Sequence, residues 1–202
     1  MTFSSFSALV DSGEALKRGL YMAMTSPSDP SLLSHLKDTA AGPDLPSPDT
    51  LWISPPGHTE QLHYDTFDNF VFQLSGSKTW TLFPPSSVPL LNPPLSASPN
   101  FSRLDLSSPS PALEALADLT VTMTLHPGDA LFVPACWYHS VASDPGSPMV
   151  ISANKFVPAK RKLEAPWMHA RVAIAEKVSQ LVERWREYRQ LPPPTVDAIL
   201  GE

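Results

Sequence analysis

Residues 51–85 read LWISPPGHTEQLHYDTFDNFVFQLSGSKTWTLFPP, and this stretch decides the fold of the chain. It contains two runs rich in β-branched and aromatic residues, NFVFQL at 69–74 and TWTLF at 79–83. Such runs are typical of strands, and the short glycine-containing connection SGSK between them predicts a β-hairpin. The stretch therefore predicts two antiparallel strands that begin just after His63-Tyr64-Asp65.

Further short strands are predicted downstream, separated by the turn sequences HPGD and DPGSP, at residues 121–125, 130–133, 138–142 and 149–156. Short strands at this spacing, without helices between them, indicate a sandwich or a barrel. Two segments rich in proline and serine, 26–50 and 84–111, can hold neither a central strand nor a long helix. The second segment is either a lid or binding loop, or a surface insertion without a role.

The C-terminal part differs in pattern. Between Pro166 and Leu191 apolar residues recur three or four positions apart, which predicts an amphipathic helix that ends before three consecutive prolines. Its stripe consists of Ala170, Ile174, Val178, Leu181, Trp185 and Tyr188. The stripe packs either against the chain's own β domain or against a second copy of the chain.

The composition indicates one acidic domain. The 202 residues, 42% of them hydrophobic, suit one compact domain with an extension. Residues 1–150 carry 5 Lys/Arg and 14 Asp/Glu, a charge of −9, whereas residues 151–202 carry 9 and 6, a charge of +3. Because nucleic-acid affinity depends on cationic groups that neutralise phosphates, the acidic body suits a basic peptide or protein better than RNA.

The same sequence favours a soluble intracellular protein. No apolar run approaches the roughly 18 residues that a membrane span requires, and the N-terminus has no secretory signal pattern. The single cysteine, Cys136, forbids an internal disulfide and agrees with a reducing compartment. We expect the protein in the cytoplasm, the nucleus or both, without a membrane partner.

Three residues form a candidate metal site. Residues i and i+2 of a strand point to the same side, so His63 and Asp65 can reach one ion together. His139 follows Asp65 by 74 positions, within PGDALFVPACWYHSV, where a turn, a strand and a proline precede it. Two histidines and one carboxylate form the facial triad of non-haem Fe(II) oxygenases, which leaves three coordination positions open.

Lys78 is the candidate cation for a co-substrate. It lies thirteen residues beyond Asp65, just past the predicted turn, where strand alternation can direct it inward. A buried lysine needs an anionic partner, and the distal carboxylate of 2-oxoglutarate would provide one. The alternative is a solvated lysine at a turn.

Together with LHPGDALFVPACWYHSV at 125–141 and ISANKF at 151–156, the opening stretch resembles the JmjC branch of the cupin-type oxygenases. The resemblance covers about residues 50–158, and residues 1–50 weakly. It implies a mainly β double-stranded β-helix of the cupin or jelly-roll type, with a C-terminal amphipathic helix. The implied organisation is a JmjC/cupin-like catalytic domain at 1–158, whose first 50 residues are a partial N-terminal part, and a helical extension at 159–202.

The resemblance also implies roles for single residues. The iron ligands and catalytic residues are His63, Asp65 and His139. The residues that bind 2-oxoglutarate are Lys78, Asn69, Asn154 and Tyr21, the last through a hydrogen bond to the same distal carboxylate as Lys78.

One position departs from the family pattern. The family often has serine or threonine three residues before the first histidine, where this chain has Glu60 beside Thr59. A carboxylate facing 2-oxoglutarate would repel it. Either Glu60 turns away and Thr59 replaces the missing hydroxyl, or the pocket itself is altered.

The implied function is that of a dioxygenase that uses Fe(II), 2-oxoglutarate and O2 to hydroxylate a macromolecule, with a protein side chain favoured. The alternatives within the family are a tRNA-base hydroxylase and a histone lysine demethylase. A non-catalytic, metal-binding cupin that acts through protein interactions is the alternative from another class. The resemblance further implies a homodimer that pairs through the C-terminal helix.

Overall fold

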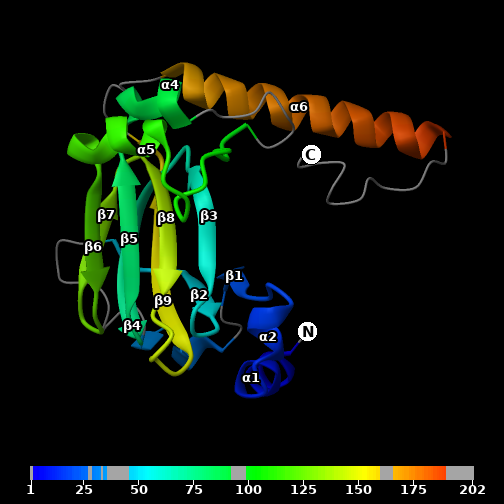
Figure 1. Cartoon of the computed structure of the whole chain (residues 1–202). Coiled ribbons are helices and arrows are strands. Elements are labelled where there is room, and N and C mark those ends of the chain that lie inside the picture. Colours follow the sequence, from blue (N-terminus) through cyan, green and yellow to red (C-terminus); the bar gives the residue numbers. More distant parts are fainter. Residues whose placement is uncertain are drawn as a thin grey trace.

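The computed structural model describes residues 2–26, 29–32, 34–35, 46–91, 99–159 and 166–189. Within these residues the strands form two antiparallel sheets that lie face to face (Figure 1). This arrangement confirms the prediction of a mainly β protein of the cupin or jelly-roll type.

The five-stranded sheet has the order β1-β2-β9-β4-β7. Its strands are β1 Met22–Thr25, β2 Thr50–Ser54, β9 Val150–Val157, β4 Asp68–Ser75 and β7 Ala130–Val133. The four-stranded sheet has the order β3-β8-β5-β6. Its strands are β3 Thr59–Tyr64, β8 Tyr138–Ser143, β5 Lys78–Phe83 and β6 Val121–Leu125.

The predicted hairpin between β4 and β5 is wrong. β4 pairs with β7 and β9 in one sheet, whereas β5 pairs with β6 and β8 in the other. The connection is instead a corner between the sheets, where Gly76 has φ 63° and an added Cβ would lie 2.9 Å from Val150. The local turn pattern predicts that the chain reverses direction, but it does not predict in which sheet the next strand pairs.

The main core lies between the two sheets. β-Branched and aromatic side chains alternate along the strands, so each sheet directs one apolar face toward the other. The buried residues of this cluster come from both sheets and are Val71, Trp80, Leu82, Leu125, Val133 and Val141. Burial of such side chains contributes roughly 1.5–3 kcal/mol each and holds the sheets together.

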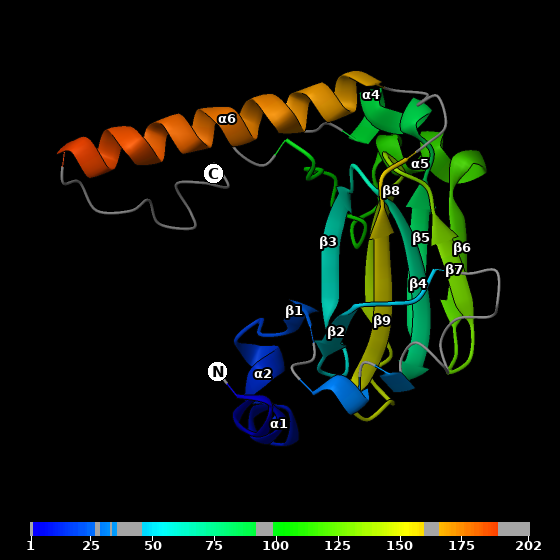
Figure 2. The same cartoon turned by 180° about the vertical axis from the view of Figure 1, so that it is seen from behind.

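Helices cover two further parts of the domain. At the N-terminus, α1 (Phe3–Asp11) and α2 (Glu14–Lys17) lie beside β1 and β2 (Figure 2), and Phe6 and Ala15 pack in one cluster with Leu51 and Ile53. At the opposite end lie the elements of the chain that follow β5, namely η1 (Pro85–Ser87), α4 (Val88–Leu91), α5 (Pro111–Leu116) and η2 (Ala117–Leu119).

The long helix α6, Pro166–Arg189, begins at this end and projects away from the sheets (Figures 1 and 2). Met168 is fully buried and Val172 packs against the same cluster, together with Leu62 and Tyr64 of β3. No described helix is both long enough and apolar enough to cross a membrane.

The interpretation that the apolar stripe of α6 packs on its own β domain is wrong. Ile174, Val178 and Leu181 are 62%, 52% and 63% exposed, whereas Met168 and Val172, near the start of the helix, pack against the domain. The side chains of Trp185 and Tyr188, and residues 190–191, lie outside the described part of the chain.

Candidate metal centre

Strand pairing brings the three candidate ligands together. His63 of β3 pairs directly with His139 of β8, and Asp65 follows the end of β3. One ligand atom from each of the three residues lies within 4.8 Å of the other two. Nε2 of His139 and Oδ2 of Asp65 are 3.7 Å apart. Two imidazoles and one carboxylate at this separation can enclose a single divalent ion.

Both imidazoles are oriented by the backbone. Nδ1 of His63 hydrogen-bonds the carbonyl of Gln61 at 2.6 Å, and Nδ1 of His139 hydrogen-bonds the carbonyl of Trp137 at 3.0 Å. A carbonyl accepts only from a protonated Nδ1, so each Nε2 keeps a lone pair for a metal. This donor set fits the Fe(II) that the sequence predicts.

Two loops fix Asp65 beside His139. The backbone N–H of Cys136 donates to the carbonyl of Asp65 at 2.8 Å, and this bond connects the loop after β3 to the loop before β8. Cys136 has φ 68°, a left-handed conformation that is uncommon outside glycine. Local strain of this kind is often found where a binding site requires a particular backbone geometry.

The electrostatics of the three residues favour a cation. Burial and, to a smaller extent, the neighbouring His63 together lower the pKa of His139 to about 3, so the imidazole is neutral. Burial raises the pKa of Asp65, and His63 partly offsets this effect. A divalent ion would reverse the cost of the buried carboxylate, because its charge stabilises the ionised form.

Lys78 faces the interior from the first position of β5. Its side chain is only 6% exposed, and Nζ donates a hydrogen bond of 3.0 Å to Oγ of Ser152 on β9. Burial lowers the pKa of Lys78 to about 8, an effect that the carboxylate of Glu60 partly counteracts. Lys78 is therefore a buried amine, and the alternative of a solvated lysine at a turn does not hold.

A chain of hydrogen bonds extends from Lys78 to the predicted amides. Oγ of Ser152 donates to Oδ1 of Asn154 at 3.3 Å, and Nδ2 of Asn154 donates to Oδ1 of Asn69 at 3.2 Å. Ser152 and Asn154 share one face of β9, and Asn69 lies on the neighbouring strand β4. The network connects the ammonium group through Ser152 to both amides.

One pocket joins the metal residues to Lys78. It has an empty volume of about 360 Å³, part of it open to solvent, and is lined by the triad, Lys78, both amides, Glu60, Ser152, Trp52, Trp80, Val141 and Phe156. Ser152 was not predicted from the sequence as a residue of this pocket. Its position two residues before Asn154 on one strand was the available signal, since such residues face the same side.

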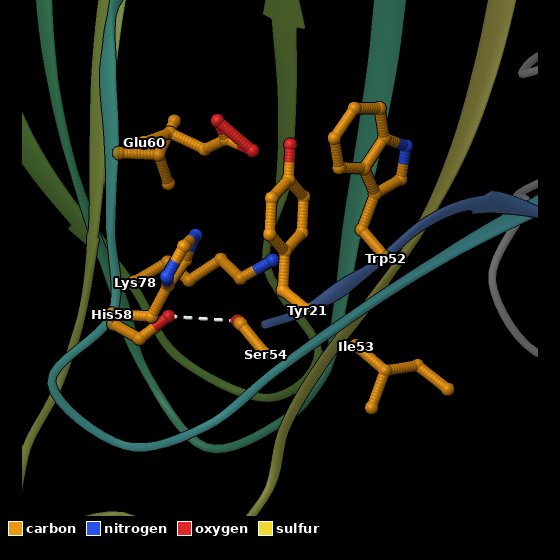
Figure 3. A pocket seen from close by; sticks show the side chains of 9 residues that line it. Tyr21, Trp52, Ile53, Ser54, His58, Glu60 and Lys78 are labelled. Carbon is orange, nitrogen blue, oxygen red and sulfur yellow. Dashed lines mark hydrogen bonds between the residues drawn. The ribbon is translucent and has the colours of Figure 1, made fainter. Parts of the chain in front are cut away.

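Tyr21 and Thr59 lie differently. Tyr21 lines an adjoining pocket with His58, Glu60 and Lys78 (Figure 3), and the centroid of its ring lies 4.6 Å from that of His58, with the two rings tilted by 32°. Thr59 is exposed and lines a groove on the outside, beside residues 102–107. Glu60 rather than Thr59 therefore faces the pocket.

The segment after β5 also reaches the site. Phe101 forms an isolated bridge with His63, and their rings stack at 5.4 Å. Phe101 belongs to the proline- and serine-rich segment 84–111, of which the structure describes residues 84–91 and 99–111. This part of the segment therefore covers a candidate metal ligand, and it is not a remote surface insertion.

Similar proteins match about half of this chain. HSPB1-associated protein 1 of Bos taurus is 37% identical over 116 residues, which cover 54% of this chain and 23% of that protein. Lysine-specific demethylase JMJ31 of Arabidopsis thaliana is 34% identical over 99 residues, 46% of this chain and 18% of that protein. tRNA wybutosine-synthesizing protein 5 of Mus musculus is 38% identical over 94 residues, 46% of this chain and 29% of that protein.

The aligned regions therefore span less than a third of the length of each of these relatives. A family model described as a cupin-like domain matches residues 1–160 of this chain. Because that match covers most of the chain, and relatives of the JmjC type match about half of it, the chain belongs to the family of JmjC-type cupin-like domain proteins.

Proposed function

We propose that the protein is an Fe(II)- and 2-oxoglutarate-dependent dioxygenase that hydroxylates a macromolecule. The observation that carries the proposal is the joint presence, in one pocket, of a His-Asp-His cluster and the buried amine of Lys78. A group of three metal-ligating side chains alone would be compatible with many cupins. A buried lysine at the other end of the same pocket calls for a dicarboxylate.

Each residue has a defined task in this proposal. His63, Asp65 and His139 would hold iron on one face and leave its remaining positions open. Lys78 would pair with the distal carboxylate of 2-oxoglutarate, and Tyr21 would line the same end of the pocket. When bound, the iron centre together with 2-oxoglutarate and O2 supplies the oxidising chemistry. The chain orients the reactants and excludes water.

Asn69 and Asn154 would complete the co-substrate pocket. Their side chains are buried and hydrogen-bonded to one another, and both line the pocket that contains the candidate metal ligands and Lys78. Amide groups held in this way can donate to a carboxylate without the entropy cost of ordering a mobile side chain. Their role is therefore to position the co-substrate.

A protein side chain is the substrate that we favour. Residues 1–150 carry a charge of −9 by the count given above, which opposes the approach of RNA phosphates and suits a basic peptide. One relative is named as a lysine-specific demethylase, and another by its association with a protein. A tRNA base is the second candidate, because a third relative is named for wybutosine synthesis. Cytoplasm and nucleus both supply such substrates.

The test is turnover of 2-oxoglutarate. Purified full-length chain with Fe(II) and O2 should convert 2-oxoglutarate to succinate, slowly alone and faster with a substrate peptide. Asp65→Asn, which keeps the side-chain shape and removes the charge, is the matched control and should be inactive. Tight metal binding without succinate release would instead support the non-catalytic cupin.

The same proposal includes a homodimer through α6. Ile174, Val178 and Leu181 expose apolar surface along one face of a helix that leaves the domain after its first turns. Contiguous exposed apolar surface of this kind is typical of an interaction site. A second copy would cover the stripe with an identical stripe, as expected for a two-fold interface.

A further inference from the structure

Glu60 faces the pocket because β3 contains an extra residue. Glu60 pairs with Val141 and His63 pairs with His139, so three steps along β3 match two steps along β8. Such a bulge shifts the alternation of the strand by one residue. Glu60 and His63 consequently line one pocket although an odd number of positions separates them.

The carboxylate of Glu60 shares its surroundings with the ammonium group of Lys78. Both residues line the metal pocket and the adjoining pocket (Figure 3). The negative charge of Glu60 raises the pKa of the Lys78 amine and so partly offsets the effect of burial. Tyr21 also responds, because burial and the neighbouring Glu60 raise its pKa. Figure 3 shows the carboxylate directed toward the tyrosine hydroxyl.

One oxygen of this carboxylate has no partner. Oε1 of Glu60 is buried and accepts no hydrogen bond within the part of the chain that the structure describes. A buried acceptor without a donor is costly, so this end of the pocket is suited to a group that can donate a hydrogen bond, or to one that leaves room for water. A second ionised carboxylate satisfies neither condition.

The charges at this end of the pocket nearly cancel. Lys78 contributes a positive charge and Glu60 a negative one. Among the other residues that line this pocket, His58 and Tyr21 can titrate. Burial lowers the pKa of His58, so its imidazole adds no positive charge. A ligand with a distal carboxylate would therefore leave an uncompensated negative charge. Like charges in a poorly solvated pocket oppose binding strongly.

We propose that Glu60 determines co-substrate specificity by competing with the distal carboxylate of the ligand for Lys78. The pocket then discriminates weakly between a 2-oxo acid with a charged tail and one with an uncharged tail of similar length. This inference rests on the proposed function, because it assumes that a 2-oxo acid binds between the metal and Lys78.

The experiment compares two ligands on one protein. Full-length chain loaded with Mn(II), which cannot start turnover, is titrated by calorimetry with 2-oxoglutarate and with 2-oxopentanoate, whose tail carries no charge. The variants are Glu60→Gln, which keeps the shape, and Glu60→Thr, which restores a hydroxyl. Glu114→Gln, at an exposed site on α5, is the matched control.

In the wild type, we expect the two ligands to bind with similar affinity. Glu60→Gln should lower the dissociation constant for 2-oxoglutarate by roughly tenfold or more, because it removes a like-charge contact. It should leave the affinity for 2-oxopentanoate nearly unchanged. Glu60→Thr should change the two affinities in the same way as Glu60→Gln. Glu114→Gln should match the wild type. Thermal melting of each variant establishes that the fold persists.

Other results separate the inference from the proposed function. Strong wild-type preference for 2-oxoglutarate, unchanged in Glu60→Gln, would overturn the inference and leave the proposed function standing. Failure of both ligands to bind to any metal-loaded variant would overturn both. Binding of 2-oxoglutarate by Glu60→Gln alone, with none by the wild type, would support the inference in its strongest form.

Discussion

The hydroxyl of Tyr64 donates a hydrogen bond of 3.0 Å to the backbone carbonyl of Met168. Tyr64 lies between the candidate metal ligands His63 and Asp65, and Met168 lies in the first turn of α6. The ring of Tyr64 also packs edge-on against Tyr138 at 4.9 Å, next to His139. The start of the projecting helix is thus attached to β3 and, through the ring of Tyr64, to β8, the strands that carry the candidate ligands His63 and His139.

Removal of this hydroxyl should loosen the attachment. Tyr64→Phe should cost about 1 kcal/mol of unfolding free energy, the usual net worth of one hydrogen bond, and lower the melting temperature by roughly 2–4 °C. Tyr138→Phe is the matched control, since the hydroxyl of Tyr138 is buried without a partner among the described residues. Calorimetry that finds equal losses in both variants would mean that the bond to Met168 does not stabilise the fold.

The metal ligands can be tested directly. His63→Ala and Asp65→Ala should each abolish binding of one Fe(II) per chain while the fold survives, because the two remaining ligands cannot enclose the ion. His126→Ala changes a histidine at the exposed turn before β7 and should bind iron as the wild type does. Anaerobic equilibrium dialysis measures the stoichiometry, and one iron per chain in His63→Ala would remove the triad assignment.

Lys78 should dominate the affinity for 2-oxoglutarate. Lys78→Ala removes a charge-assisted contact in a dry pocket, worth roughly 1.5–3 kcal/mol, so the dissociation constant should rise about ten- to a hundredfold. Lys78→Arg should also bind weakly, since a planar guanidinium does not replace a compact ammonium group. Calorimetry with Mn(II)-loaded protein is the measurement. Equal affinities for wild type and Lys78→Ala would place this lysine outside the co-substrate site.

The buried amine should also affect stability at alkaline pH. Burial lowers the pKa of Lys78 to about 8, whereas a lysine in an unfolded chain titrates near 10.4. Between these values the unfolded state binds more protons, so the destabilisation that comes from burying the charged amine declines as pH rises, by about 3 kcal/mol over the whole window. Urea denaturation of the metal-free wild type and of Lys78→Met from pH 7.5 to 10 measures the free energy of unfolding of each. The difference between the two free energies should change by this order across the range. If the difference in unfolding free energy is the same at every pH, the pKa of Lys78 is not lowered in the folded protein.

The apolar stripe of α6 should control assembly. Ile174→Glu with Leu181→Glu places two charges in the proposed seam and should yield monomers with an unchanged melting temperature, because both side chains are more than half exposed within one chain. Ala173→Glu with Gln180→Glu adds the same charge on another face and should remain dimeric. Light scattering decides the matter, and a monomeric wild type at micromolar concentration would rule out the homodimer.

Much of the fold follows from local sequence pattern. The predicted ranges 121–125 and 130–133 coincide with β6 and β7, and the remaining predicted strands begin or end within one residue of the observed ones. Helix α6 begins at Pro166, where the pattern predicts it. These features depend on residues close together in the chain, where alternation and helical periodicity report directly on the backbone.

The pairing of strands was not accessible in the same way. The turn after β4 predicts a reversal, yet β4 and β5 belong to different sheets, and only long-range pairing decides this. Likewise the stripe of α6 was recognisable as apolar, but its exposure depends on where the first turns of the helix attach to the domain. A periodic pattern identifies a face without identifying what covers it.

The sequence by itself determined that His63 and Asp65 can bind one ion, since two positions along a strand return a side chain to the same side. Only the tertiary structure decided that Glu60, rather than Thr59, faces Lys78. Strict alternation from His63 would direct Thr59 inward and Glu60 outward. The extra residue of β3, which arises from its pairing with β8, reverses that order, because a bulge is a property of two paired strands and not of either strand alone.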